Sequence, residues 1–315
     1  MKKALVLGAS GGMGSAITFE LISRGIKVIA FARNIKKLKA LYEGNNLVEI
    51  KEGDVFNYSQ LMDAAKGAEC IYHAVNLPYQ EWQTKQEPMI NNILQVSENV
   101  GAKLAVVDNI YSYAESTGEK ASEEYEKNPQ TKKGKIRLKI GKKVMDSKVQ
   151  AFIAHFPDFY GPYAESTVLH YFLQSIIDHK KAMFVGDKKV PREYIYTPDG
   201  AKALVELSLH EKAYGQCWNI PGTGVITGEE IIKIIQEITG YSRKVSTVTK
   251  NMVRFIGIFD PSMKEYVEMY DLTQKPLILN GEKLECLIGP IQKTSYKEGL
   301  EGTLNTMKEK GLITI

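Results

Sequence analysis

The sequence predicts an α/β fold in which a doubly wound parallel sheet is followed by a smaller C-terminal part. The length of 315 residues suits one large α/β domain, or one such domain with a smaller cap. Short apolar runs alternate strictly with amphipathic stretches in the first half, which is typical of parallel strands covered by helices on both faces. A glycine-rich turn directly follows the first apolar run.

The expected elements follow this alternation along the chain. Strands are expected at residues 4–7, 27–31, 47–51, 70–74, 103–107 and 151–156, and helices at 12–24, 35–43, 58–67, 86–100 and 134–148. In the second half we expect helices at 166–180 and 198–210 and strands at 194–196 and 217–220. Thr227 and Glu230 have the spacing of a capping box, which predicts the start of another helix. We place a first domain at 1–160 and a smaller part at 161–315, with segments near 190–222 returning to the first domain.

Composition excludes several classes of protein. The 41 basic and 37 acidic residues give a net charge of only +4, too small to favour nucleic acid or a membrane as the main partner. The cysteines Cys70, Cys217 and Cys286 form no CxxC pair, which fits a reducing cytoplasm. The five histidines show no metal-ligand spacing, so we expect no metal site. No apolar stretch approaches the roughly 20 residues of a membrane helix.

The glycine-rich turn predicts a site for a dinucleotide. Gly8, Gly11 and Gly14 are spaced three apart between the first strand and the first helix. Glycine permits the tight turn and the close approach of a pyrophosphate, and the helix N-terminus offers N–H groups to the phosphates. The cofactor-binding residues expected here are Gly8, Ser10, Gly11, Gly12, Met13 and Gly14.

The GxxGxxG spacing resembles the short-chain dehydrogenase/reductase superfamily. Further segments resemble its extended or atypical branch, the NAD-dependent epimerase/dehydratase family: residues 52–55, 107–111, 156–162 and 192–201. The resemblance implies a Rossmann-type domain at 1–160, a substrate-binding part at 161–315, and an NAD(P) cofactor. Related proteins often dimerise through helices that correspond to 86–100 and 134–148, so the resemblance allows a homodimer.

The end of the second strand indicates which dinucleotide binds. It carries Arg33 and no carboxylate, and a guanidinium suits a 2′-phosphate, so we expect NADP, with NAD as the alternative. By resemblance, Asp54 and Val55 hold the adenine. The nicotinamide side is implied to be lined by His73, Ala74, Val75, Phe156, Pro157 and Asp158. His73 is equally interpretable as a packed core histidine.

The family resembled here uses a Tyr-x-x-x-Lys pair, and this chain departs from that pattern. Lys133 and Arg137 align with the tyrosine and the lysine, and Asn109 replaces a Ser or Thr. In so lysine-rich a run we expect Lys133 to be exposed. Tyr111 is the preferred proton carrier, with Arg137 lowering its pKa, so the catalytic residues expected are Tyr111, Asn109 and Arg137. The alternative is that Tyr111 only shapes a pocket.

The resemblance also implies a substrate side. The residues expected there are Asn76, Tyr113, Phe159, Tyr160 and Arg192. Arg192 occupies the position at which sugar-nucleotide epimerases bind a diphosphate, although a surface pair with Glu193 is the alternative. Two functions remain open: an NAD(P)-dependent oxidoreductase or epimerase that acts at a hydroxyl or carbonyl of a small or sugar-like substrate, and a non-catalytic NADP(H) sensor.

Overall fold

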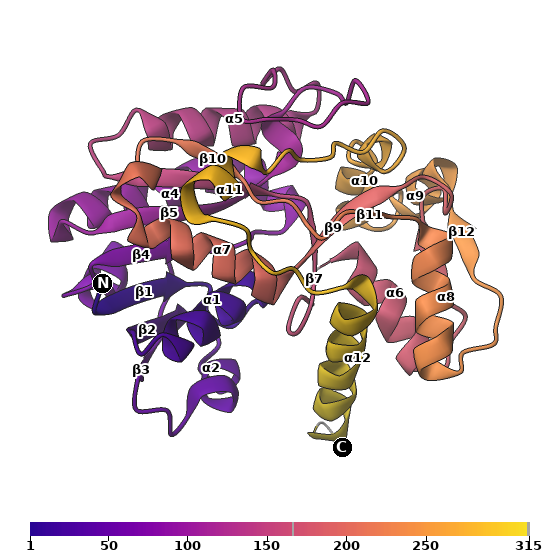
Figure 1. Cartoon of the computed structure of the whole chain (residues 1–315), viewed down its shortest axis with the longest axis horizontal. Coiled ribbons are helices and arrows are strands. Elements are labelled where there is room, and N and C mark those ends of the chain that lie inside the picture. Colours follow the sequence, from indigo (N-terminus) through magenta and orange to yellow (C-terminus); the bar gives the residue numbers. More distant parts are fainter. Residues whose placement is uncertain (166, 314–315) are drawn as a thin grey trace.

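The computed structural model describes residues 1–165 and 167–313, and within them a seven-stranded parallel sheet forms the centre of the first part (Figure 1). Its strands run in the order β10-β6-β5-β4-β1-β2-β3. Their bounds are β1 Lys3–Leu7, β2 Lys27–Ala32, β3 Val48–Glu52, β4 Cys70–His73, β5 Lys103–Asn109, β6 Ala151–Phe156 and β10 Cys217–Asn219. The predicted parallel sheet is confirmed. The strand order reverses between β1 and β4, which is where such sheets form a crevice for ligands.

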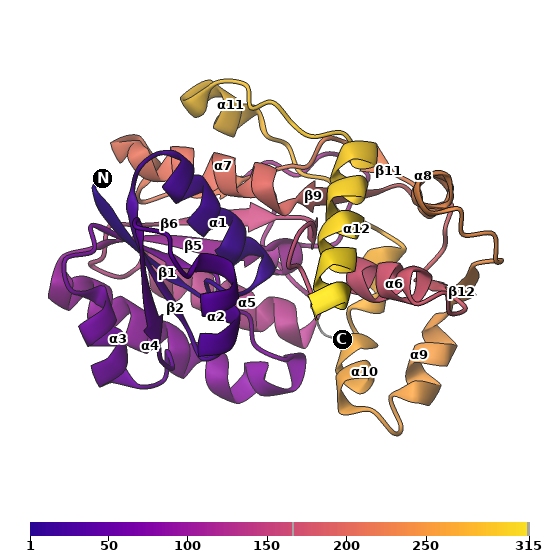
Figure 2. The same cartoon turned by 90° about the horizontal axis from the view of Figure 1, so that it is seen from below.

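Helices cover both faces of this sheet (Figures 1 and 2). One face carries α1 (Gly12–Ser23), α2 (Ile35–Tyr42), α7 (Thr197–Leu209) and α11 (Glu282–Ile288), and the other carries α3 (Tyr58–Ala65), α4 (Trp82–Val100) and α5 (Lys132–Met145). Alternate residues of β1 enter the two cores, with Val6 on the first face and Leu7 on the second. The apolar runs in the sequence therefore mark strands that are buried on both sides.

The remaining elements form a second part with its own core. Strand β9 (Arg192–Tyr196) pairs in parallel with β7 (Asp158–Tyr160) and antiparallel with β11 (Val225–Ile226), while β8 (Met183–Val185) pairs with β12 (Ser246–Val248). The helices are α6 (Val168–Ile177), α8 (Gly228–Thr239), α9 (Lys250–Ile256), α10 (Pro261–Tyr266) and α12 (Tyr296–Ile313). Side chains such as Phe172, Ile231 and Leu304 meet in this core. In Figure 2, α9 and α10 lie at one edge of the molecule.

Short 3-10 helices connect several of these elements. They are η1 (Tyr79–Glu81), η2 (Ile110–Ser112), η3 (Glu211–Ala213) and η4 (Tyr270–Thr273). The capping box of Thr227 and Glu230 is confirmed, because each side chain accepts a hydrogen bond from the other residue's backbone N–H. Residue 166, the expected start of a helix, lies outside the described residues, and the helix observed there ends at Ile177.

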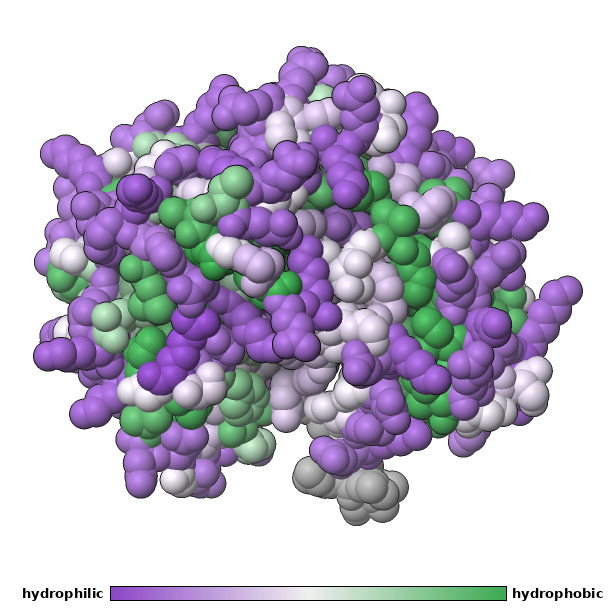
Figure 3. All heavy atoms as spheres, viewed as in Figure 1, coloured by the Kyte–Doolittle hydropathy of each residue, from purple (hydrophilic) through white to green (hydrophobic). Residues whose placement is uncertain are grey.

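Helix α4 begins four residues earlier than expected. It starts at Trp82 and not at the expected residue 86, so Pro88 lies inside the helix. Charged and polar side chains cover most of the face shown in Figure 3. Within the described residues, none of the helices combines the length and the apolar character that crossing a membrane requires.

Candidate functional site

The glycine turn is held between β1, β4 and α1. Gly8 has a φ of +81°, and a Cβ atom there would lie 2.9 Å from the Ala74 carbonyl oxygen. A Cβ atom on Gly14 would lie 2.0 Å from the Gly8 carbonyl oxygen. Larger residues therefore cannot occupy these two positions without opening the turn.

The N-termini of α1 and α4 lack the side-chain cap that the crossover helices α2, α3 and α5 carry. Asn34, Asn57 and Thr131 cap α2, α3 and α5 with their side chains, whereas the N-cap of α1 is Gly11 and no described side chain accepts a hydrogen bond from its first-turn N–H groups. Gly11 is exposed, and a Cβ atom there would meet only the Gly8 carbonyl oxygen, at 3.5 Å. The first-turn N–H groups are therefore available to an outside acceptor, which fits a phosphate group.

Other residues expected around the dinucleotide contribute in different ways. Met13 is buried in the core, so only its backbone is available to a ligand, while Ser10 is half-buried. Arg33 follows β2 and is exposed, and it forms no ion pair within the described part of the chain. Asp54 stabilises its own loop, because its Oδ1 accepts a hydrogen bond from the Phe56 N–H at 3.0 Å. Val55 is buried.

The end of β4 is partly buried. His73 is almost fully buried, and burial together with the positive charge of Arg137 lowers its pKa to about 3. Its Nδ1 atom has no hydrogen-bond partner within the described residues. The ring is therefore neutral near neutral pH and packs as a core side chain. Ala74 and Val75 are half-buried and Asn76 is exposed.

Two tyrosine hydroxyls meet at the ends of β4 and β5. Tyr79 of η1 and Tyr111 of η2 are hydrogen bonded through their hydroxyl oxygens, 2.7 Å apart, and the pair is only partly buried. Both rings pack near Trp82, at centroid distances of 5.2 and 6.2 Å. Tyr111 was expected at this site and Tyr79 was not, although the position of Tyr79 shortly after a buried strand was a usable signal.

Arg137 does not have the role expected of it. Its guanidinium lies over the Trp82 ring at 4.3 Å, and its Nε is 3.3 Å from the carboxylate of buried Asp108. The pKa of Tyr111 is raised well above its ordinary value, first by burial and then by the nearby Tyr79 and Asp158. The expectation that the Tyr111 pKa is lowered is therefore wrong, because burial dominates and the Arg137 guanidinium is paired with Asp108 instead.

Lys133 is buried, which corrects the expectation that it is exposed. Its side chain is only 2% exposed, and its Nζ lies 2.5 Å from a Glu265 carboxylate oxygen and 2.6 Å from one of Glu268. Both carboxylates belong to the region of α10, more than a hundred residues along the chain. The lysine-rich run suggested a solvated face, but this one position points inward to a pair of carboxylates.

Asn109 and Tyr113 serve the local structure. The Asn109 Oδ1 accepts the Tyr111 N–H at 3.0 Å and thereby caps η2. Tyr113 is buried and donates its hydroxyl to the Asn219 Oδ1 at 2.7 Å, so its polar end is already engaged.

The segment after β6 is mixed in exposure. Phe156 and Pro157 are buried, and Phe159 packs on Phe156 with ring centroids 5.3 Å apart. Tyr160 is buried in the core of the second part. Asp158 keeps contact with solvent. The protein around its carboxyl group reduces the hydration of the charged form and so raises its pKa, while the positive charge of Arg192 opposes that rise.

Arg192 and Glu193 do not form a surface pair, because both are buried and bond to different partners. The Arg192 Nη2 donates to the Val185 carbonyl at 2.7 Å, while its Nε has no partner within the described residues. The Glu193 carboxylate accepts from the Gly222 and Leu279 N–H groups. Adjacent residues of a strand point to opposite faces, which separates the two side chains.

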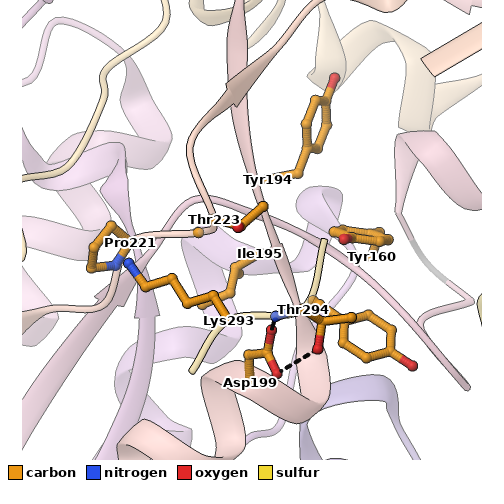
Figure 4. Close-up of a pocket in the computed structure, with 10 residues that line it drawn as sticks. Tyr160, Tyr194, Ile195, Asp199, Pro221, Thr223, Lys293 and Thr294 are labelled. Carbon is orange, nitrogen blue, oxygen red and sulfur yellow. Dashed lines mark hydrogen bonds between the residues drawn. The ribbon is translucent and has the colours of Figure 1, made fainter. Parts of the chain in front are cut away.

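A small pocket beside β9 contains only one residue of the predicted site. Tyr160 lines it together with Asp199, Thr223 and Lys293 (Figure 4). The Asp199 carboxylate accepts hydrogen bonds from the N–H and the hydroxyl of Thr294, at 2.6 and 2.9 Å. The pocket therefore marks where the chain before α12 is attached to α7.

Within the described residues, no group of His, Cys, Asp or Glu side chains is arranged to hold a metal ion.

Comparison with known proteins agrees with this geometry. Residues 8–139 match the family model described as NAD(P)H-binding. The fold is that of several sugar-nucleotide enzymes. A dTDP-glucose 4,6-dehydratase from Streptomyces venezuelae, with NAD bound, is 18% identical with a TM-score of 0.80, covering 98% of each chain. A UDP-glucuronic acid 4-epimerase from Bacillus cereus in complex with NAD is 19% identical with a TM-score of 0.79, covering 98% of this chain and 99% of that one. A UDP-glucose 4-epimerase from Thermotoga maritima is 18% identical, with a TM-score of 0.78 over 98% and 99% of the two chains.

Proposed function

We propose that this chain is an NAD(P)-dependent oxidoreductase or epimerase that acts at a hydroxyl or carbonyl group of a small or sugar-like substrate. The observation that supports this most is the uncapped N-terminus of α1 beside Gly8 and Gly11, at the point where the strand order reverses. This is the arrangement that binds a pyrophosphate. The matching NAD(P)H-binding model begins at this glycine.

The cofactor is held chiefly by backbone in this proposal. The N–H groups after Gly11 bind the pyrophosphate, and Asp54 and Val55 lie at the adenine side. Arg33 is placed after β2 to bind a 2′-phosphate, which favours NADP. Two of the similar structures contain NAD, so NAD is the alternative. When bound, the dinucleotide supplies a hydride donor or acceptor.

In this proposal the substrate binds between the first domain, residues 1–160, and the smaller substrate-binding part, residues 161–315. The similar structures are dehydratases and epimerases of nucleotide sugars, which supports a sugar-like substrate. Arg192 supports an anionic group, because its buried guanidinium keeps an Nε that no described residue uses. The usual Tyr-x-x-x-Lys pair is replaced by Lys133 and Arg137, so in this proposal Tyr111 transfers the proton and Asn109 fixes the Tyr111 backbone.

The proposed location of the protein is the cytoplasm.

A fluorescence titration with NADPH and NADH tests dinucleotide binding. Gly11→Ala should fold normally and bind either one at least tenfold more weakly, because its new methyl group stands where the phosphates approach. Gly141→Ala is the matched control, since Gly141 lies in α5 with ordinary packing space and away from the turn. Equal affinities of wild type and Gly11→Ala would contradict the proposal.

The second candidate is a non-catalytic NADP(H) sensor. It is favoured by one observation: Lys133 and Arg137 are both ion paired and therefore are not free to act in catalysis. NADPH consumption with a panel of aldehydes, ketones and nucleotide sugars distinguishes the enzyme from the sensor. Tight binding of NADPH without turnover of any of them would favour the sensor.

A further inference from the structure

Five large apolar side chains are exposed together in α9 and the turn that follows it. We call them the apolar tip: Met252, Phe255, Ile256, Ile258 and Phe259. Phe255, Ile258 and Phe259 are 66, 70 and 79% exposed, and the two phenylalanine rings contact only each other's edge, with centroids 6.1 Å apart. The other four exposed large apolar side chains in the described part of the chain lie singly on different elements. Gathered apolar side chains of this kind mark a surface that binds something, whereas single ones need no explanation.

The apolar tip is held away from the protein core by the rest of its helix pair. A Cβ atom on Gly257 would lie 2.9 Å from the Lys264 Cα, so α9 and α10 meet with no room for a side chain between them. The chain of α10 is fixed to α5 in turn, because Glu265 and Glu268 both bind the buried ammonium of Lys133. Figure 2 shows both helices at one edge of the molecule, away from the seven-stranded sheet. The tip therefore needs an external partner to leave water.

The chain around the tip is basic. Residues 241–264 contain five basic residues and one acidic residue, against 41 and 37 in the whole chain. The near balance of the whole chain favoured no membrane partner, and this segment departs from that balance. Four of its basic residues are exposed and form no ion pair within the described part of the chain: Arg243, Lys244, Arg254 and Lys264.

The acidic residues near the tip are engaged within the protein. Asp260 begins α10, where its Oδ1 accepts the Met263 N–H at 3.3 Å. Asp271 binds Lys250 of α9 at 2.6 Å. Glu265 and Glu268 face Lys133 as described above. The positive charges of Arg254 and Lys264, on the two helices that carry the tip, are therefore left unopposed.

An anionic lipid surface fits both features of this segment. Phenylalanine and isoleucine side chains are stabilised at the boundary between headgroups and acyl chains, and lysine and arginine beside them bind lipid phosphates. A second copy of this chain fits less well. A two-fold contact through the tip would place the unopposed cations near their own counterparts, and stable interfaces bury about 20–30 residues on each side.

We propose that the apolar tip attaches this protein to the surface of a membrane that carries anionic lipids. Phe255, Ile258 and Phe259 enter the headgroup boundary, while Arg254 and Lys264 stay at the level of the phosphates. The attachment is peripheral and reversible, because it uses a few side chains and no membrane-spanning helix. This goes beyond the proposed function and does not depend on it, since the first turn of α1 belongs to another part of the molecule.

Sedimentation of the full chain with lipid vesicles tests the attachment. We expect wild type to bind vesicles of phosphatidylcholine and phosphatidylglycerol in equal parts, and Phe255→Ser/Phe259→Ser to bind them at least tenfold more weakly. Tyr171→Ser is the matched control, since this side chain is 64% exposed on α6. All three proteins should keep the same melting temperature and the same NADPH affinity. Wild type that does not bind these vesicles, or that binds them no better than the double variant, would overturn the proposal.

The charge requirement has its own arm. Binding should weaken at least tenfold with vesicles of phosphatidylcholine alone, and also when salt is raised from about 0.1 M to about 1 M. Arg254→Gln/Lys264→Gln should lower the affinity for the anionic vesicles, whereas Lys36→Gln/Lys39→Gln, which removes two exposed charges from α2, should not. Equal affinity for both kinds of vesicle would overturn the assignment to an anionic surface.

A further variant keeps the test decisive if the serine substitutions disturb folding. Both native tryptophans, Trp82 and Trp218, are buried, so Phe259→Trp adds a tryptophan that reports on the tip. Its fluorescence should shift to shorter wavelength with the anionic vesicles and be quenched by lipids brominated on their acyl chains. An unchanged spectrum would contradict insertion.

The oligomeric state tests the alternative occupant of the tip. Light scattering in the absence of lipid should give the same mass for wild type and Phe255→Ser/Phe259→Ser. A wild-type dimer that becomes a monomer in this variant would assign the tip to a second copy and overturn the proposal.

Discussion

Lys133 and Glu268 join the first turn of α5 to the chain that follows α10, with the ammonium nitrogen 2.6 Å from a carboxylate oxygen. Glu265 completes the cluster at 2.5 Å. The lysine is buried while the two carboxylates keep part of their contact with water. A buried ammonium needs such partners, because its loss of hydration is not otherwise compensated.

Removing the carboxylates should therefore cost more stability than removing the lysine. Lys133→Met should lower the free energy of unfolding by about 2 kcal/mol, and Glu265→Gln/Glu268→Gln by about 3 kcal/mol or more, because the latter leaves a buried charge unpaired. The triple variant should be more stable than the sum of these losses predicts. Urea unfolding measures all three. Lys135→Met, at an exposed position of the same turn, is the control, and a loss in Lys133→Met no larger than in this control would contradict the assigned role.

Buried Glu193 should give the protein a distinctive pH dependence. Burial raises its pKa to about 7 from a reference value of 4.5, despite hydrogen bonds from two backbone N–H groups. Between these values the folded state holds a proton that the unfolded state has lost, so the free energy of unfolding falls as the pH rises. The loss amounts to about 3 kcal/mol across this window.

The pH effect is isolated by comparing wild type with Glu193→Gln in urea unfolding at about pH 5 and about pH 8. His73 and His155 act in the opposite direction, because burial lowers their pKa values to about 3 and about 4. At about pH 5 the free energy of unfolding of Glu193→Gln should be lower than that of wild type. Between about pH 5 and about pH 8 it should decrease less than that of wild type. Glu124→Gln, at an exposed position, should follow wild type. Parallel curves for Glu193→Gln and wild type would show that Glu193 titrates normally.

Substitutions at Gly11 and Gly14 should distinguish a loss of dinucleotide affinity from a loss of folding stability. Gly14→Ala places a methyl group against the Gly8 carbonyl and should destabilise the fold by about 2 kcal/mol or more, whereas Gly11→Ala has room and should not. Both variants should lose dinucleotide affinity. Thermal unfolding without ligand, together with NADPH titration, distinguishes them. Equal melting temperatures for the two variants would mean that the turn is looser than its contacts indicate.

Arg33 should discriminate between the two dinucleotides. Arg33→Ala should weaken NADPH binding by tenfold or more and leave NADH binding nearly unchanged, because only the former carries a 2′-phosphate. Calorimetric titration of both measures this. Arg243→Ala, an exposed arginine of the second part, controls for the loss of net charge. Equal losses for both dinucleotides would argue against a phosphate contact.

The sheet could be predicted because its signal is local. All six residues of β6 are buried, so an uninterrupted apolar run marked a strand covered on both faces. The glycine turn was also local, since its three glycines lie within one strand-to-helix connection. The expected strands therefore match the observed ones closely.

The polar surroundings of the site were harder to predict because they join distant parts of the chain. Lys133 meets carboxylates 132 and 135 residues away, and no spacing within its own helix indicates such partners. Arg137 and Asp108 likewise come from different elements. Burial and contributions from Tyr79 and Asp158, which belong to other elements, raise the pKa of Tyr111, so residue type alone suggested a change in the wrong direction.

Gly12 faces the chain that follows β7: a Cβ atom there would lie 2.7 Å from the Ala164 Cα. The first helix and the second part of the protein therefore share one tightly fitted junction. A protein engineer who wishes to alter coenzyme affinity here must change both sides of that junction together, since enlarging either residue alone forces the other to yield.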